Sequence, residues 1–224
     1  NVIVVLMNGR PIIEPWVYEN APAILEVWHL GSQAGNAIAD VLLGKYNPAG
    51  KLPVTIPRHA GQIPIYYNYL QNGRPFDKNR DPKFVFWSHY NDEENAPQYP
   101  FGYGLSYTSF SYTDMKLDKE SITTAEDVKV HVTITNTGDF DGEEIVQLYI
   151  RDVVAKPMRP VKELRGFKKI NLKKGQSERV TFEINAETLG SYGFDGNYST
   201  QKGLFQIMIG SHSEDVQMKE LTIK

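Results

Sequence analysis

The chain has 224 residues, with 24 lysines and arginines against 27 aspartates and glutamates, and it contains no cysteine. This length fits one large domain or two smaller ones. The formal net charge of −3 offers no basic face for nucleic acid or for an anionic membrane surface. The lack of cysteine excludes a disulfide scaffold, thiolate zinc sites and cysteine nucleophiles. No apolar run approaches the roughly 18–20 residues of a membrane span, so we expect neither nucleic acid nor a bilayer-crossing helix.

The first half of the chain predicts part of an α/β layer. Residues 2–6 form a continuous apolar run, which is typical of a strand buried on both faces of a parallel sheet, and residues 23–28 predict a second strand. Residues 35–43 predict a helix that ends before Gly44. Residues 52–56 predict a short extended piece, and long aromatic loops follow. Because two strands and one helix do not close an α/β layer, we expect the C-terminal part of an α/β sandwich domain.

The second half predicts a succession of strands. Val128, Val130, Val132 and Ile134 alternate with polar residues, as in a strand with one buried face. Further strands are predicted at residues 145–150, 162–172, 179–184, 204–209 and 216–223, with turn residues between several of them. Short, regularly spaced strands of this kind indicate an all-β, antiparallel sandwich. The antibody-type cysteine pair is absent, which favours a fibronectin type III-like fold.

A change in composition marks the boundary between the two halves. Residues 1–112 hold 11 of the 13 prolines and 18 of the 26 aromatic residues, whereas residues 113–224 read almost entirely as strands. Charge is nearly even across this point, so the change reflects architecture. We therefore predict two domains, 1–112 and 113–224.

Seven sequence strings, spread over nearly the whole chain, together resemble glycoside hydrolase family 3, the retaining exo-acting β-glucosidases and β-xylosidases. The strings are VLMNGRP (5–11), GNAIADVLLG (35–44), NPAGKLP (47–53), GQIP (61–64), GRP (73–75), YPFGYGLSY (99–107) and RPVKELRGF (159–167). The resemblance extends to the periplasmic β-glucosidases within the family. It implies a protein with a barrel-type domain, an α/β sandwich and a fibronectin type III-like domain, of which this chain holds the end of the second and all of the third.

The resemblance also places the chemistry outside the chain. A retaining glycosidase uses two carboxyl groups about 5–5.5 Å apart, one as nucleophile and one as acid/base. On the family's pattern both precede Asn1, so no residue here is expected to be catalytic, and the fragment alone is expected to be inactive. The implied substrate is a β-glucoside or oligosaccharide bound through the missing N-terminal domain. No cofactor or metal is implied, the location is periplasmic or secreted, and a homodimer stays open.

The candidate substrate-binding residues are Trp87, Tyr90 and Asp92. Aromatic faces stack on the C–H faces of sugars, and a carboxylate accepts hydrogen bonds from hydroxyl groups. Family members often carry a Tyr-x-Asp string here, which the resemblance transfers to Tyr90 and Asp92. The alternative is a solvated acidic loop, because Glu93, Glu94 and Asn95 follow directly.

One position departs from the family's pattern. Where the family has Gly-x-Glu-Gly-Gly ahead of the helix, this chain has Gln33 and Ala34 in place of the glutamate and the second glycine. A glutamine retains hydrogen-bonding capacity but no ionic or acid/base role.

Other residues favour structural roles. Tyr66, Tyr67 and Tyr69 are expected to bury their rings and to use their hydroxyls on backbone partners. Residues 99–107 are expected to connect the two domains, and Lys162 and Arg165 to form ion pairs with the neighbouring domain. The histidines show no metal-binding spacing.

Two other classes of protein stay open. One is a non-catalytic carbohydrate-binding or structural module. The other is a fibronectin-type adhesion module, which the string at 35–44 disfavours because adhesion does not require it.

Overall fold

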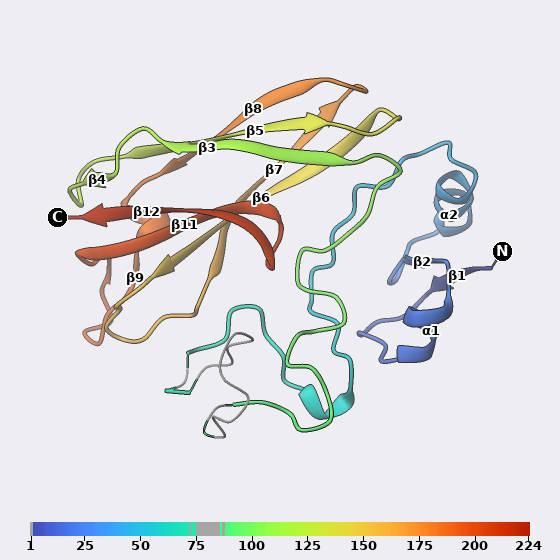
Figure 1. Ribbon diagram of the computed structural model, residues 1–224, viewed down its shortest axis with the longest axis horizontal. Coiled ribbons are helices and arrows are strands. Elements are labelled where there is room, and N and C mark those ends of the chain that lie inside the picture. The colour runs from blue at the N-terminus through green and yellow to red at the C-terminus, as the bar shows by residue number, and fades with distance from the viewer. Residues whose placement is uncertain (1, 72, 75–85, 87) are drawn as a thin grey trace.

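The computed structural model describes residues 2–71, 73–74, 86 and 88–224; Figure 1 shows a large β-sandwich and a small α/β unit, with extended segments running between them. The α/β unit contains β1 (Ile3–Leu6), α1 (Pro15–Asn20), β2 (Ala23–Glu26) and α2 (Ala34–Leu42). The strands β1 and β2 pair in parallel, as residues 2–6 and 23–28 predicted. A 3-10 helix, η1 (Ala60–Gln62), follows in the next segment. Residues 52–56, predicted as a short extended piece, bend at Pro53 and Val54 and form only an isolated bridge, between Ile56 and Tyr99.

The sequence patterns did not predict helix α1. Pro15 occupies its first turn, where the missing N–H of proline removes no helical hydrogen bond. The Tyr18 hydroxyl donates to the carbonyl of Ile12 at 2.6 Å, and its ring meets Tyr99 edge-on at 5.3 Å. Burial, followed by the negative charge of Glu26, raises the pKa of Tyr18 to about 12, so the hydroxyl stays a neutral donor. A tertiary contact therefore supports a helix too short to be stable alone.

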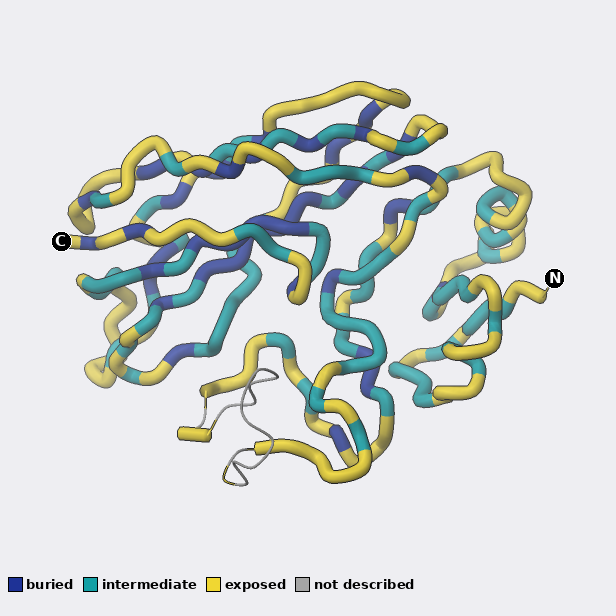
Figure 2. The backbone as a smooth tube through the Cα atoms, viewed as in Figure 1, coloured by how far each residue is buried: buried dark blue, intermediate teal, exposed yellow. Residues whose placement is uncertain are grey.

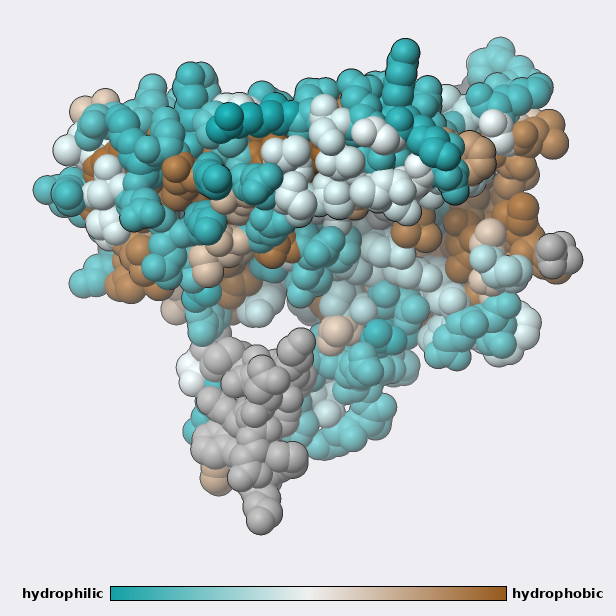
Figure 3. All heavy atoms as spheres, turned by 45° about the horizontal axis from the view of Figure 1, so that its top comes forward, coloured by the Kyte–Doolittle hydropathy of each residue, from teal (hydrophilic) through white to brown (hydrophobic). Residues whose placement is uncertain are grey.

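The prediction that residues 2–6 are buried on both faces is wrong for this chain. Ile3 is 50% exposed and the rest of β1 is only half-buried, because among the described residues its one partner strand is β2. Figure 2 shows this unit in the colours of intermediate and exposed residues, and Figure 3 shows hydrophobic side chains on the surface at this end of the molecule. Leu30, Leu43 and Met7 are also exposed there. An apolar run thus indicates that a strand tends to be buried, but the neighbours that would bury it are not specified by the run itself.

The sandwich is built from two facing sheets. One has the strand order β4-β12-β11-β6-β7 and the other the order β3-β5-β8. Their bounds are β3 (Phe110–Leu117), β4 (Ser121–Ile122), β5 (Val128–Asn136), β6 (Gly142–Asp152), β7 (Glu163–Leu172), β8 (Ser177–Ile184), β11 (Gly203–His212) and β12 (Asp215–Ile223). Pairing is antiparallel except between β12 and β4. A short helix, α3 (Ala186–Leu189), and a hairpin of β9 (Ser191–Tyr192) and β10 (Tyr198–Ser199) connect β8 to β11.

The alternation read in residues 128–134 places the core. Val128, Val130, Val132 and Ile134 are fully buried against residues of the other sheet, such as Phe205, while the intervening side chains face outward. Burial of aliphatic side chains from both sheets is the main stabilisation of this unit. The fold is therefore mostly β, with the sandwich in the C-terminal half.

Strand β3 lies across the point where the sequence changes composition. Its residues from Phe110 onward pair with β5, and Tyr112 packs against the sandwich core. The sequence patterns did not predict this strand, because its aromatic start resembles the loops before it.

A buried polar cluster joins the two units. The Lys51 ammonium lies 3.2 Å from Glu144 Oε1 and donates to the carbonyl of Gly104 at 3.1 Å. The Tyr112 hydroxyl donates to the same glutamate oxygen at 2.8 Å. Burial, followed by the negative charge of Glu144, raises the pKa of Tyr112, which keeps it a donor. The Lys51 and Glu144 side chains are only 11% and 4% exposed, so each charge depends on the other.

Residues 99–107 connect the two units, as predicted. Leu52 and Gly102 lie in contact through a backbone hydrogen bond of 2.8 Å, and the Gln147 side chain of β6 donates to the carbonyl of Gly102 at 3.0 Å. Gly102 has φ +81°, and a Cβ there would overlap the Gln147 side chain, so the close approach requires glycine. On the other side, the Tyr107 hydroxyl donates to the carbonyl of Val41 in α2.

No helix among the described residues combines the length and the apolar character needed to cross a bilayer.

Candidate functional site

A small hollow of about 90 Å³ lies where the segment at residues 58–62 meets the loop at residues 90–96. It is lined by His59, Gly61, Gln62, Tyr90, Asp92 and Glu93. The segment is shaped by local bonds: His59 precedes η1 and its Nδ1 accepts from the backbone N–H of Gly61 at 3.0 Å. That bond assigns the proton of a neutral imidazole to Nε2, which leaves Nε2 as a donor.

The opposing loop is closed by one asparagine. Asn95 Oδ1 accepts from the backbone N–H of Tyr90 at 3.0 Å, and Asn95 Nδ2 donates to the carbonyl of Ser88 at 2.8 Å. The Tyr90 hydroxyl reaches across the hollow to the carbonyl of Gly61, 3.5 Å away. Tyr90 therefore forms one wall of the hollow, and 41% of the residue is exposed.

The lining groups have the chemistry that a sugar requires. The Asp92 carboxylate forms no hydrogen bond or ion pair within the part of the chain that the structure describes, so its oxygens are available as acceptors. His59 and the Tyr90 hydroxyl add donors, and the Tyr90 ring adds an apolar face. A hollow of this size holds part of a sugar ring, such as one or two hydroxyl groups, rather than a whole oligosaccharide.

Two of the three candidate residues lie together: Tyr90 and Asp92 line the same hollow, while Trp87 lies outside the described residues. That they bind substrate stays a prediction. His59 and Gln62 were not predicted as part of a site. The GQIP string at 61–64 marked the segment, but nothing in the sequence joined it to a loop some thirty residues later.

The expectation for the three tyrosines is correct for one of them. Tyr67 stacks on Phe101 at 4.2 Å, and its hydroxyl accepts from the backbone N–H of Leu164 at 3.2 Å. Tyr66 and Tyr69 are 64% and 54% exposed, so they do not bury their rings within this chain.

The expectation that Lys162 and Arg165 pair with the neighbouring unit is wrong. Lys162 contacts Glu214, and Arg165 contacts Glu163, all within the sandwich. The strand region around them meets the first unit through backbone groups instead: the N–H of Val161 donates to the carbonyl of Tyr69. Arg165 and Glu163 are two residues apart on β7, and Lys162, just before β7, meets Glu214 in the turn between β11 and β12.

Gln33 has only a local role in the structure. It precedes α2 and its side chain accepts from Asn36 Nδ2 at 2.5 Å, without capping the helix. Ala34 is the first residue of α2. Gln33 is exposed and Ala34 is half-buried, so the side chain at residue 33 lies outside the packed interior of this chain.

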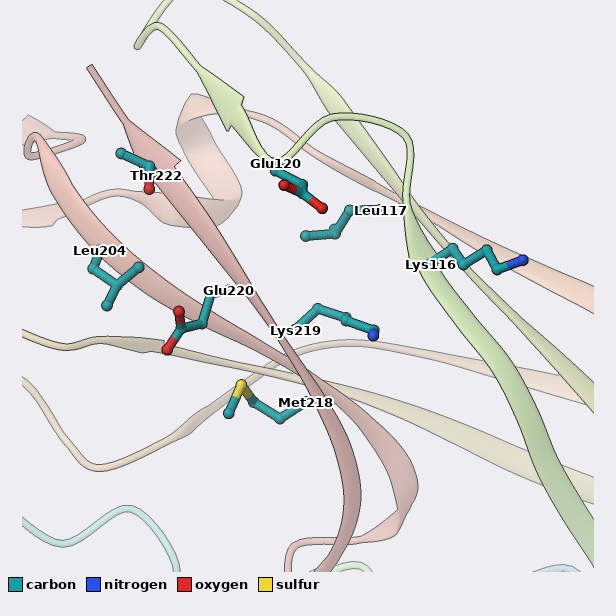
Figure 4. Close-up of a pocket in the computed structure, with 8 residues that line it drawn as sticks. All are labelled: Lys116, Leu117, Glu120, Leu204, Met218, Lys219, Glu220 and Thr222. Atoms are coloured by element: carbon teal, nitrogen blue, oxygen red, sulfur yellow. The ribbon is translucent and has the colours of Figure 1, made fainter.

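A larger hollow of about 640 Å³ lies at the edge of the sandwich between β3 and β12. Figure 4 shows that its side chains do not converge: Met218 and Glu220 lie on one side of β12, and Leu117 and Glu120 lie on the other. It is an open groove between strands and lacks the focused polar groups of a ligand site. Within the described ranges no group of three or more histidine and acidic side chains could hold a metal ion.

Sequence profiles match both units. The profile of the glycosyl hydrolase family 3 C-terminal domain matches residues 1–107, and that of a fibronectin type III-like domain matches residues 144–213. Among characterised relatives, the periplasmic β-glucosidase of Salmonella typhimurium is 45% identical over 96% of this chain and 28% of its own length. A β-xylosidase of Formosa agariphila is 39% identical over 100% of this chain and 30% of its own length.

Solved structures agree over the whole chain. The β-glucosidase of Listeria innocua, in complex with isofagomine, superposes with a TM-score of 0.93 at 40% identity, covering 99% of this chain and 31% of that one. A β-glucosidase of Erythrobacter marinus has a TM-score of 0.89 at 41% identity, over 99% of this chain and 28% of that one.

The α/β unit joined to a fibronectin type III-like sandwich corresponds to the part of these relatives that the chain matches. The chain belongs to glycoside hydrolase family 3. It spans about 30% of the length of the relatives that it matches.

Proposed function

We propose that this chain is the C-terminal part of a retaining exo-β-glycosidase that hydrolyses terminal, non-reducing β-D-glucosyl residues. The observation that carries the proposal is similarity over 96–99% of the chain to proteins named as β-glucosidases, one in sequence and one in structure. Because another relative is named as a β-xylosidase, a terminal xylosyl residue is the alternative substrate.

We assign the chain a supporting role in this reaction. A retaining mechanism needs two carboxyl groups that face each other across the glycosidic bond. The hollow offers Asp92 and Glu93, but these are consecutive residues on one exposed loop. On the proposed assignment, the nucleophile and the acid/base belong to the portion of the parent protein that this chain does not include, and the chain alone does not turn over substrate.

Within that role, Tyr90 and Asp92 contact the sugar, with Trp87 assigned beside them from the sequence resemblance alone. The open Asp92 carboxylate accepts a hydrogen bond from a sugar hydroxyl, and the Tyr90 ring packs on the sugar's C–H face. Losing a hydrogen bond to a charged group costs about 1.5–3 kcal/mol, which corresponds to roughly 10- to 150-fold in affinity.

The test joins this chain to the remainder of its parent protein and measures kcat and KM on a chromogenic β-glucoside. Asp92→Asn is expected to raise KM more than it lowers kcat, because it removes a binding contact rather than a reacting group. Asp139→Asn, on an exposed turn of the sandwich, is the matched control. If Asp92→Asn leaves KM unchanged, Asp92 does not contact the substrate.

The same experiment separates the enzyme from its rival. Turnover by the 224-residue chain alone would contradict the supporting role. Binding of cello-oligosaccharides by the chain with no activity in the joined protein would favour a non-catalytic carbohydrate-binding module.

We further propose that the chain comprises two units that meet near residues 112 and 113, the first being the C-terminal part of an α/β sandwich domain. This boundary falls inside β3, and because β3 pairs with β5 from Phe110 onward, the second unit also takes in the residues of β3 before it. A periplasmic or secreted location follows the Salmonella relative's name, and fractionation of the source cells tests it. Light scattering of the joined protein decides between a monomer and a homodimer.

A further inference from the structure

The side chain of Gln62 is one of the most completely buried polar groups of the first unit, with only 2% of the residue exposed. Its Oε1 accepts from the backbone N–H of Arg58 at 2.7 Å. Its Nε2 donates to two carbonyls of the opposing loop, Glu94 at 2.8 Å and Ala96 at 3.3 Å. The amide therefore satisfies both of its donors and its acceptor, and it ties the loop to the segment that carries His59.

Arg58 makes a second attachment to the same loop. Its Nε donates to the carbonyl of Ala96 at 3.2 Å, and a terminal nitrogen donates to the Gln98 side chain at 3.3 Å. The other terminal nitrogen lies 3.2 Å from a carboxylate oxygen of Glu94. This ion pair is partly exposed and contributes less than the buried amide bonds.

The chemistry at residue 62 requires an amide. Both carbonyls of the loop are acceptors, so a carboxylate there would face them without a proton to donate. An aliphatic side chain would remove the Gln62 donor from the Glu94 carbonyl and leave the Ala96 carbonyl with Arg58 alone. The same loop carries Tyr90 and Asp92 just ahead of these attachments, and its own closure by Asn95 fixes its shape but not its position over His59.

We propose that Gln62 is a positioning residue that holds the loop at residues 90–96 so that Asp92 and Tyr90 face His59 in one site. This inference rests on the proposed function for its sugar ligand, but the attachment itself is a property of this chain. A ligand that needs both walls binds only the fraction of molecules in which the loop is held, so loosening the loop weakens apparent affinity without changing the contacts.

The experiment compares Gln62→Met and Gln62→Glu in the 224-residue chain with Gln33→Glu as the matched control, since Gln33 is exposed and contacts only its own helix. Amide hydrogen exchange is followed at Tyr90, Gln98 and the strands of the sandwich. We expect at least about tenfold faster exchange in the loop, with the sandwich unchanged. Because a protonated carboxyl regains a donor, lowering the pH should slow the loop again in Gln62→Glu but not in Gln62→Met.

Sugar binding is then measured by titration with cellobiose and with laminaribiose, using hydrogen exchange at the same amides as the readout. Gln62→Met should weaken binding at least about threefold, and it should add little in an Asp92→Asn background if Gln62 acts through Asp92. Loop exchange that stays unchanged in both variants overturns the inference, and so does a full, independent loss of affinity in the Asp92→Asn background. If the unaltered chain binds neither sugar, the proposed function fails for this site, and the exchange data alone still decide whether Gln62 holds the loop.

Discussion

The buried ion pair between Lys51 and Glu144 gives the sharpest test of how the two units are joined. Replacing Lys51 by methionine keeps the length of the side chain and removes its charge. The Glu144 carboxylate would then keep only the Tyr112 hydroxyl as a partner in a site where its side chain is 4% exposed. A buried charge that loses its counter-ion is costly, because neither water nor a second cation replaces it.

The magnitude follows from the geometry. At the 3.2 Å separation of the two charged atoms, an effective dielectric constant of about 20 gives a gross attraction of about 5 kcal/mol. Breaking one side of a buried pair typically costs 3–5 kcal/mol, which is consistent with this value. We therefore expect Lys51→Met to lower the free energy of unfolding by about 3–5 kcal/mol, a large share of the stability of an ordinary domain.

The assay is urea unfolding followed by circular dichroism for the sandwich and by tryptophan fluorescence for the first unit, which holds all three tryptophans. Lys174→Met is the matched control, since Lys174 pairs with Asp139 at 2.7 Å but both side chains are largely exposed. This control should not move the unfolding midpoint measurably. Adding Glu144→Gln to Lys51→Met should restore much of the loss, because the neutral amide still accepts from Tyr112.

Two results would refute this reasoning. One is a loss for Lys51→Met no larger than that for Lys174→Met. The other is a double variant that is less stable than Lys51→Met, since that would mean the unpaired carboxylate is not the source of the loss.

Three further outcomes are expected. Burial lowers the pKa of His212, so below about pH 6.5 the unfolded chain binds more protons at this residue than the folded chain. The stability that neutral His212 contributes is therefore complete above about pH 6.5 and is lost as the pH falls. His212→Gln should flatten this part of the pH dependence of the urea midpoint. Phe205→Ala should cost about 3–5 kcal/mol, whereas Phe194→Ala should leave thermal unfolding nearly unchanged, because these side chains are 0% and 87% exposed. A fragment of residues 108–224 should unfold cooperatively and at higher temperature than residues 113–224, which lack the first part of β3; equal melting temperatures would contradict this.

Local sequence pattern was sufficient to predict the elements in which each face keeps the same environment along its whole length. The alternation at residues 128–134 predicted β5 and its buried face, because every second side chain of a strand points to the same side. The same holds for the helix at residues 35–43, whose apolar side and following glycine are local signals. The ordered strings across the chain predicted the family before any contact was known.

Local pattern failed where a neighbour distant in sequence decides the outcome. The apolar run at residues 2–6 is a strand, but its burial depends on partners that its own letters do not specify. Lys162 and Arg165 carry charges that suggested contacts between units, yet their acidic partners lie within the sandwich, Glu214 in the turn between β11 and β12 and Glu163 at the start of β7.

The sequence by itself determined the family, the order of α/β unit and sandwich, and the candidacy of Tyr90 and Asp92. Only the tertiary structure decided that His59 and Gln62 face these two residues, because the segments are some thirty residues apart and are joined by hydrogen bonds to backbone carbonyls. Side-chain type does not reveal which carbonyl a buried amide will meet. That choice depends on how the chain folds back on itself, and it places an open carboxylate, a tyrosine ring and an imidazole around one hollow.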